Sequence, residues 1–144
     1  MSGGINSMEL KEVISKRKSI RSFQDKEVPD LTEIIELAKK GPSAGAIRGY
    51  QAIVTTEKLV YNAPVSVVIC IDEAAYEKRY GERGRNLYAI QDATIFGAYL
   101  GLLLVEWGLC SVWVGAFRED RIKRILGTEL KPVAVIAVGY GQDE

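Results

Sequence analysis

The hydrophobic positions of the chain follow a helical spacing in some segments and a strand-like pattern in others. Helices are predicted where apolar residues recur three and four positions apart: Glu9–Lys16, Asp30–Lys40, Glu73–Arg79 and Glu119–Leu126. Strands are predicted where short runs are rich in valine and isoleucine: Tyr50–Thr56, Val65–Ile71, Ser111–Val114 and Val133–Val138. Glycine and charged residues predict a loop at Tyr80–Gly84. This mixture of short helices and few strands predicts an α+β fold.

The longest predicted helix is Asn86–Trp107, and its second half, Ile95–Val105, is apolar on every face. A helix that is hydrophobic all round is buried all round. One subunit of this size rarely encloses a whole helix, so we expect a partner chain to cover part of it. Gly97 and Gly101 lie four apart on one face, and we expect them to let another helix approach closely.

The apolar stretch from residue 93 to residue 117 is long enough to span a bilayer, and its only charged residue is Glu106. Two features favour a buried helix of a soluble domain instead. Gly108 indicates that the helix ends before it, and Ser111–Phe117 has the pattern of a strand. The first residues, Met1–Ser7, lack the apolar core of a signal peptide, and we expect a disordered tail there.

The composition is that of one globular domain, expected over residues 8–144. A chain of 144 residues, 47% of them hydrophobic and 26% charged, buries about two-thirds of its unfolded surface without disulfides. Its 19 basic and 19 acidic residues cancel, so no overall field favours nucleic acid or an anionic membrane. Cys70 and Cys110 lie in apolar runs without a C-x-x-C pair, which indicates reduced thiols in a cytoplasmic protein.

Histidine is absent from the chain. Its absence excludes imidazole-based catalytic triads, the usual zinc sites and a histidine general base. We therefore expect no metal site. If the protein is an enzyme, a bound cofactor carries the difficult chemistry.

Three segments carry residues suited to an anionic or flat ligand. In an extended chain Arg17, Ser19 and Arg21 point to the same side, so two guanidinium groups and a hydroxyl can converge on a phosphate. The alternative is that these cations are solvated at the end of the first helix. Gly41–Gly45 lets backbone N–H groups approach a flat ligand, and Trp113–Phe117 ends in a Gly-Ala turn. Taken singly, these last two are better explained as an ordinary turn and a strand end.

Taken together and in this order, the motifs resemble those of the nitroreductase family of FMN-dependent oxidoreductases. The resemblance covers nearly all of the chain from Met8 to Gly141. The matching segments are 17–23 with Val28-Pro29, 41–45, 80–84, 90–93, 108–117 and 132–140. Their collinearity is more specific than any one of them, and it favours ligand binding by the arginine segment.

The resemblance implies a homodimer with the nitroreductase fold, in which helices flank a central, mostly antiparallel sheet and the long buried helix lies at the interface. It also implies an FMN site between the two subunits. Arg17, Lys18 and Ser19 would hold the phosphate and the ribityl chain, and Arg21 would lie near the N1–C2=O edge of the flavin. A loop from the other subunit and the backbone turn facing N5 and O4 would complete the site: Pro42, Ser43, Ala44, Gly45, Ala46, Gly115 and Ala116.

The same resemblance implies an activity. Electrons would pass from NAD(P)H to the flavin and then to a nitro compound, a quinone or another small organic acceptor, in a ping-pong scheme. Two alternatives remain open, a flavin-binding protein without turnover and a cofactor-free dimeric interaction module. Departures from the family pattern motivate the first alternative. Ala46 and Arg48 stand where many members have Asn and Gln, and the chain stops at Glu144, before a basic residue that often completes the phosphate site.

Overall fold

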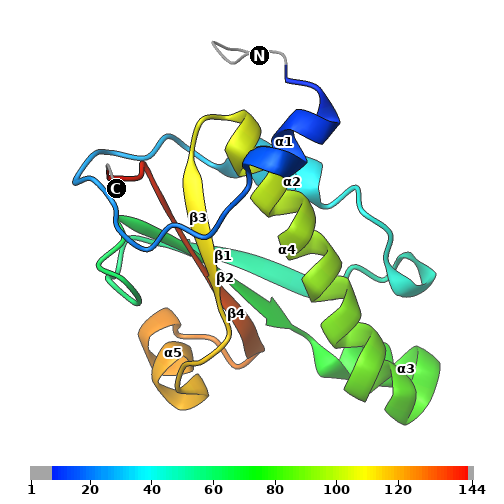
Figure 1. The fold of residues 1–144 in the computed structure, drawn as a ribbon. Helices are drawn as coiled ribbons and strands as arrows, with labels where there is room; N and C mark the ends of the chain where they lie inside the picture. Colours follow the sequence, from blue (N-terminus) through cyan, green and yellow to red (C-terminus); the bar gives the residue numbers. More distant parts are fainter. Residues whose placement is uncertain (1–7, 143–144) are drawn as a thin grey trace.

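The computed structural model of the protein describes residues 8–142, so the predicted tail Met1–Ser7 lies outside the described residues. Within that range, antiparallel strands form one sheet in the order β1-β2-β4-β3 (Figure 1). The strands are β1 (Tyr50–Thr55), β2 (Val65–Ile71), β3 (Cys110–Val114) and β4 (Lys131–Gly139). The predicted strands and the predicted antiparallel sheet flanked by helices are confirmed.

The two central strands, β2 and β4, are covered on both faces. On one face, β2 and β4 pack against α2 (Thr32–Ala38) and α4 (Ala89–Glu106). On the other face they pack against α5 (Glu119–Leu126), so helices lie on both sides of the sheet (Figure 1). Every residue of β2 is buried. A strand without a solvated side has little place for polar residues, which is why both strands are nearly continuous apolar runs, with Ser66 the polar residue of β2.

The prediction of a loop at Tyr80–Gly84 is wrong, because that segment is helical. The remaining helical elements are α1 (Leu10–Lys16), a 3-10 turn η1 (Ala44–Ala46), α3 (Glu73–Arg83) and a π-helical segment η2 (Gly84–Tyr88). α3, η2 and α4 follow one another without a loop, and the path bends at Gly81, whose φ is 66° and ψ −151°. Gly84 is buried, and a Cβ there would lie 2.5 Å from the carbonyl oxygen of Tyr76. This glycine therefore permits close packing between turns.

The long helix α4 is covered on one side only. Phe96, Leu100 and Leu104 are fully buried in the core beneath it, whereas Ala98 and Tyr99 are exposed. The expectation that one subunit cannot enclose this helix agrees with that exposure. The partner chain that would cover the open side stays a prediction.

The two glycines of α4 have different surroundings. A Cβ at Gly97 would collide with the ring of Trp113 on β3 and lie 3.0 Å from Cδ1 of Ile69. A Cβ at Gly101 would meet no heavy atom within 4 Å. The expectation that both admit a second helix is therefore wrong for Gly97, whose free space is filled by the same subunit. It stays a prediction for Gly101.

The helical stretch Glu73–Glu106 has the length and apolar composition of a membrane span, and 39% of its most apolar window is buried in this structure. The core helices of soluble proteins share that length and composition. α4 packs its buried side against the sheet. The structure therefore agrees with the prediction that this stretch is a core helix and not a membrane span.

The segment after α1 is extended, as predicted. Ser19 forms a β-bridge with Ser111, and Phe23 forms one with Gly141. The backbone N–H of Ile20 donates to the carbonyl oxygen of Ser111 at 3.1 Å. Ile20 is buried, whereas Ser19 and Arg21 on either side are exposed. This alternation directs the two polar side chains of the motif away from the core.

Candidate functional site

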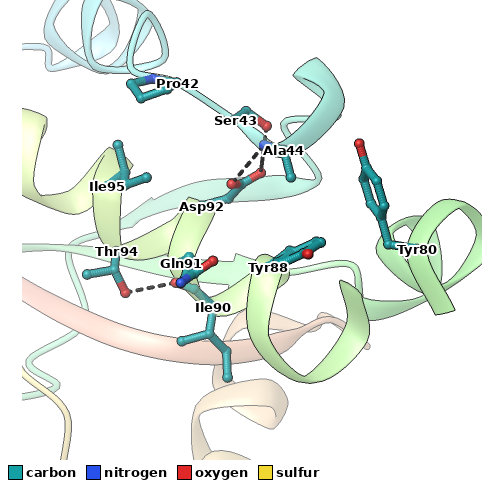
Figure 2. Close-up of a pocket in the computed structure, with 10 residues that line it drawn as sticks. All are labelled: Pro42, Ser43, Ala44, Tyr80, Tyr88, Ile90, Gln91, Asp92, Thr94 and Ile95. Carbon is teal, nitrogen blue, oxygen red and sulfur yellow. Dashed lines mark hydrogen bonds between the residues drawn. The ribbon is translucent and has the colours of Figure 1, made fainter. Parts of the chain in front are cut away.

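The larger of two cavities along α4 has a volume of about 690 Å³. Its walls come from the loop before η1, from α3 and η2, and from the first turns of α4 (Figure 2). The lining residues are Pro42, Ser43, Ala44, Tyr80, Tyr88, Ile90, Gln91, Asp92, Thr94 and Ile95. This volume lies within the range of about 300–1,000 Å³ that is typical of small-molecule sites.

A buried carboxylate joins the loop to α4. Asp92 is 3% exposed and accepts hydrogen bonds from three uncharged donors. The Ser43 hydroxyl donates at 2.5 Å, the Ala44 backbone N–H at 3.1 Å and the Tyr76 hydroxyl at 2.7 Å. Figure 2 shows Ser43 and Ala44 directed toward Asp92. Hydrogen bonds to a charged group contribute about 1.5–3 kcal/mol each, and together they offset the cost of burying the carboxylate.

The hydroxyl groups of this cluster are also acceptors. Ser43 Oγ accepts the backbone N–H of Arg48 at 2.8 Å, and the Tyr76 hydroxyl oxygen accepts that of Gly49 at 2.9 Å. Burial raises the pKa of the Tyr76 hydroxyl, and its hydrogen bond to Asp92 raises that pKa further. Tyr76 therefore stays protonated at neutral pH, and its hydroxyl donates a hydrogen bond to the carboxylate.

The loop has an unusual backbone that hydrogen bonds hold in place. Gly45, Ala46 and Arg48 have φ values of 54°, 56° and 46°, in the left-handed region. For residues other than glycine this region costs roughly 1–2 kcal/mol each. The Arg48 side chain spans the loop, since its Nε donates to the Lys39 carbonyl at 2.7 Å and its Nη2 to that of Gly41 at 3.1 Å.

The predicted phosphate-binding segment lies at the second cavity, of about 300 Å³. Arg17 lines it, and so do Gly101 of α4 and Trp113 of β3. Two residues beyond Trp113 the strand has ended, and Gly115 and Ala116 are exposed. A Cβ at Gly115 would meet no heavy atom within 4 Å, so the backbone of this turn is open to an approaching ligand.

Four of the eleven predicted site residues line these two cavities. The other seven line neither: Lys18, Ser19, Arg21, Gly45, Ala46, Gly115 and Ala116. Pro42, Ser43 and Ala44 line the larger cavity, and Arg17 lines the smaller one. The cavities have no lining residue in common, because α4 contributes residues 90–95 to the first and 97–102 to the second. A single subunit does not bring these four residues into one cavity.

The residues that organise the loop received no role from sequence reasoning. Asp92 is the acid at a buried position of α4, whose other buried positions include Ala89, Ala93 and Phe96. Asp92 is three positions after Ala89 and four before Phe96, so it lies on that same face. A single acid among apolar core positions was therefore the sequence signal that could have identified it. Tyr76 and Arg48 offered no comparable signal, because their partners are backbone groups and residues distant in sequence.

Comparison with known proteins identifies the family. The sequence profile of the nitroreductase family matches residues 54–140. A Methanothermobacter thermautotrophicus protein with the provisional name NADH dehydrogenase/NAD(P)H nitroreductase is 31% identical, over 96% of this chain and 80% of its own length. This chain belongs to the nitroreductase family. Its recognition from the motifs is therefore confirmed, and so is the coarse function of an oxidoreductase.

Solved structures support the same family assignment. A nitroreductase family protein from Streptococcus pneumoniae superimposes with a TM-score of 0.86 at 22% identity, over 94% of this chain and 92% of its own, which shows the shared fold. An FMN-dependent nitroreductase from Clostridium difficile superimposes with a TM-score of 0.76 at 26% identity, over 92% of this chain and 87% of its own.

Proposed function

We propose that this nitroreductase is a homodimer that binds FMN between its subunits and passes electrons from NAD(P)H to a small organic acceptor. The observation that carries the proposal is that Pro42, Ser43 and Ala44 line one cavity along α4 while Arg17 lines another. A second subunit that packs on the open side of α4 would bring its loop 42–46 to the arginine segment of the first. Each of two such sites would then be complete.

Exposed apolar side chains along α4 and its neighbours favour that packing. Ile14 and Trp113 line the smaller cavity, Ile90 lines the larger one, and all three are exposed together with Leu10 and Tyr99. Gathered apolar surface of this kind marks interaction sites in soluble proteins. The open space at Gly101 gives a second chain room to approach.

The residues present fit FMN. A phosphate requires fixed cations, and Arg17 lies at a cavity while Arg21 follows on the exposed side of the same extended segment. A flat ring requires backbone that it can approach closely, and the open turn at Gly115 supplies it. Arg17 and Ser19 would hold the phosphate and ribityl chain, with Lys18 beside them.

Bound FMN would supply the two-electron chemistry. The task of the protein is then to bind, orient and stabilise charge. Arg21 would stabilise the negative charge that develops at the N1–C2=O edge, and the backbone N–H groups of the Gly115 turn would orient the opposite edge. The donor is proposed as NAD(P)H because the name of the 31% identical relative includes it.

The visible absorption spectrum of the purified protein tests the proposal. We expect a yellow protein with one FMN per chain, which sediments as a dimer. NADH or NADPH should bleach the flavin absorbance in the absence of oxygen. Arg17→Ala and Arg21→Ala should each weaken FMN binding about tenfold or more, since each removes charge-assisted hydrogen bonds. Arg124 is exposed on α5, away from the proposed site, so Arg124→Ala is the matched control and should leave FMN binding unchanged.

Two outcomes would overturn the proposal in different ways. A monomer that stays colourless with excess FMN would refute flavin binding altogether. A yellow dimer that neither nicotinamide bleaches would leave a flavin-binding protein without turnover. We also propose a cytoplasmic location, which the two free thiols, Cys70 and Cys110, support.

A further inference from the structure

We propose that Asp92 is a positioning residue, whose buried carboxylate holds the loop 42–46 in the conformation that receives the flavin. This inference rests on the proposed function, because it assigns a task to a residue within the proposed FMN site. Asp92 itself contacts the loop, and it acts on the ligand through Ser43 and Ala44.

The carboxylate engages three separate parts of the chain. Its Oδ2 accepts hydrogen bonds from the Ser43 and Tyr76 hydroxyl groups, and both carboxylate oxygens share the Ala44 N–H, Oδ1 at 3.1 Å and Oδ2 at 3.2 Å. Through Ser43 Oγ the cluster reaches the N–H of Arg48, and through the Tyr76 oxygen it reaches that of Gly49. One buried group therefore determines the loop on both sides of η1.

A loop left to itself would not keep this conformation. Ala46 in this loop and Arg48 just after it have left-handed backbone conformations. Both residues carry a Cβ, so this conformation is strained for them, as it would not be for glycine. The hydrogen bonds to and through Asp92 select this backbone among the alternatives. A ligand that binds the preformed loop then avoids the entropy cost of ordering it, which increases its affinity.

The direction of the hydrogen bonds also determines what the loop offers to a ligand. The Ser43 hydroxyl proton and the Ala44 N–H are both donated to Asp92. Pro42 has no N–H and no polar side-chain atom. The side chains of these residues therefore offer the cavity no free donor, which suits the face of a flat ring better than a charged group.

Asp92→Asn tests the inference with little change of shape. An amide has one acceptor oxygen in place of two, so either the pair of hydroxyl groups or the Ala44 N–H faces a donor. We expect FMN binding to weaken about tenfold or more, measured by fluorescence quenching at a temperature at which the variant is fully folded. Ser43→Ala should weaken binding as well, and the double variant should lose less than the product of the two effects.

Hydrogen exchange without any ligand supplies the readout that separates the loop from global stability. Asp92→Asn should accelerate exchange at the Ala44, Arg48 and Gly49 amides by about tenfold or more relative to core strand amides. Thr94→Val is the matched control for exchange, because Thr94 lies on the same helix and bonds only its own turn, donating to the Ile90 carbonyl at 2.8 Å. It should leave those three amides unchanged.

Each result decides one claim. Unchanged exchange at the three amides in Asp92→Asn and Ser43→Ala would overturn the inference, and so would accelerated exchange with unaltered FMN affinity. Multiplicative effects of the two substitutions on FMN affinity would also overturn it. Wild-type protein that binds no FMN would instead refute the proposed function. If Asp92→Asn does not fold, Ser43→Ala alone tests the inference. This substitution removes the acceptor of the Arg48 N–H, so hydrogen exchange at that amide should accelerate.

Discussion

Replacement of Gly97 by alanine should destabilise the protein, although alanine is the better helix former. Gly97 lies on the buried side of α4, where a Cβ would collide with the ring of Trp113 and approach Ile69 Cδ1 to 3.0 Å. Ile69 is fully buried in β2 and has nowhere to retreat. The added methyl must therefore displace Trp113, which lines the cavity beside Arg17.

The magnitude follows from two opposed contributions. Alanine gains about 1 kcal/mol over glycine in a helix interior. Overpacking costs typically about 1–3 kcal/mol. The exposed Trp113 ring can shift toward its cavity but buried Ile69 cannot move, so this site belongs in the upper half of that range. The net loss should be about 1–2 kcal/mol in the free energy of unfolding. For a domain of this size that loss lowers Tm by about 3–8 °C.

Urea denaturation of four proteins measures this effect: wild type, Gly97→Ala, Trp113→Ala and the double variant. Without the indole ring only Ile69 Cδ1 stays close to the methyl, so Gly97→Ala should become nearly neutral in the Trp113→Ala background. The coupling between the two substitutions should be about 1–2 kcal/mol. Equal effects of Gly97→Ala in both backgrounds would refute the packing of Trp113 on α4.

Three further substitutions probe the loop and the core. Tyr76→Phe removes a donor to buried Asp92 and should lower the free energy of unfolding by about 1–3 kcal/mol in urea titrations. Gly45→Ala should lower Tm, because its φ is 54° and the new methyl would lie 2.6 Å from Arg79 Nη1. Cys70→Ala should flatten the loss of stability between pH 9 and 10, since burial raises the pKa of the Cys70 thiol from 9.0 to about 11.

The sign of the Cys70 effect follows from proton binding. Above pH 9 the unfolded thiol loses its proton while the folded thiol keeps it, so stability falls as the pH rises, by at most about 1.4 kcal/mol per pH unit. Unfolding measured at intervals from pH 8 to 11 gives the slopes. Identical slopes for wild type and Cys70→Ala would contradict the prediction. Unchanged urea midpoints for Tyr76→Phe, or an unchanged Tm for Gly45→Ala, would contradict the other two.

Much of the fold was accessible from the sequence because its signals are local. The continuous apolar run Val65–Ile71 predicted a central strand, and Glu119–Leu126 followed by Gly127 predicted a short helix and its end. Gly127 has a φ of 67°, as a helix-terminating glycine should. Local signals failed at Gly81 and Gly84. Gly81 bends the helical path and Gly84 permits close packing between turns. From composition alone, a glycine in either role looks the same as a glycine in a loop.

The sequence by itself determined the elements, the family and the residues predicted to bind FMN, because hydrophobic periodicity and collinear motifs are written along the chain. Only the tertiary structure decided how those residues group. Ser43 and Asp92 are 49 positions apart, and no local pattern reveals that they share a hydrogen bond. Likewise, only folding places Arg17 and Pro42 at separate cavities along α4. Both facts depend on contacts between distant segments, which arise when burial of apolar surface brings those segments together.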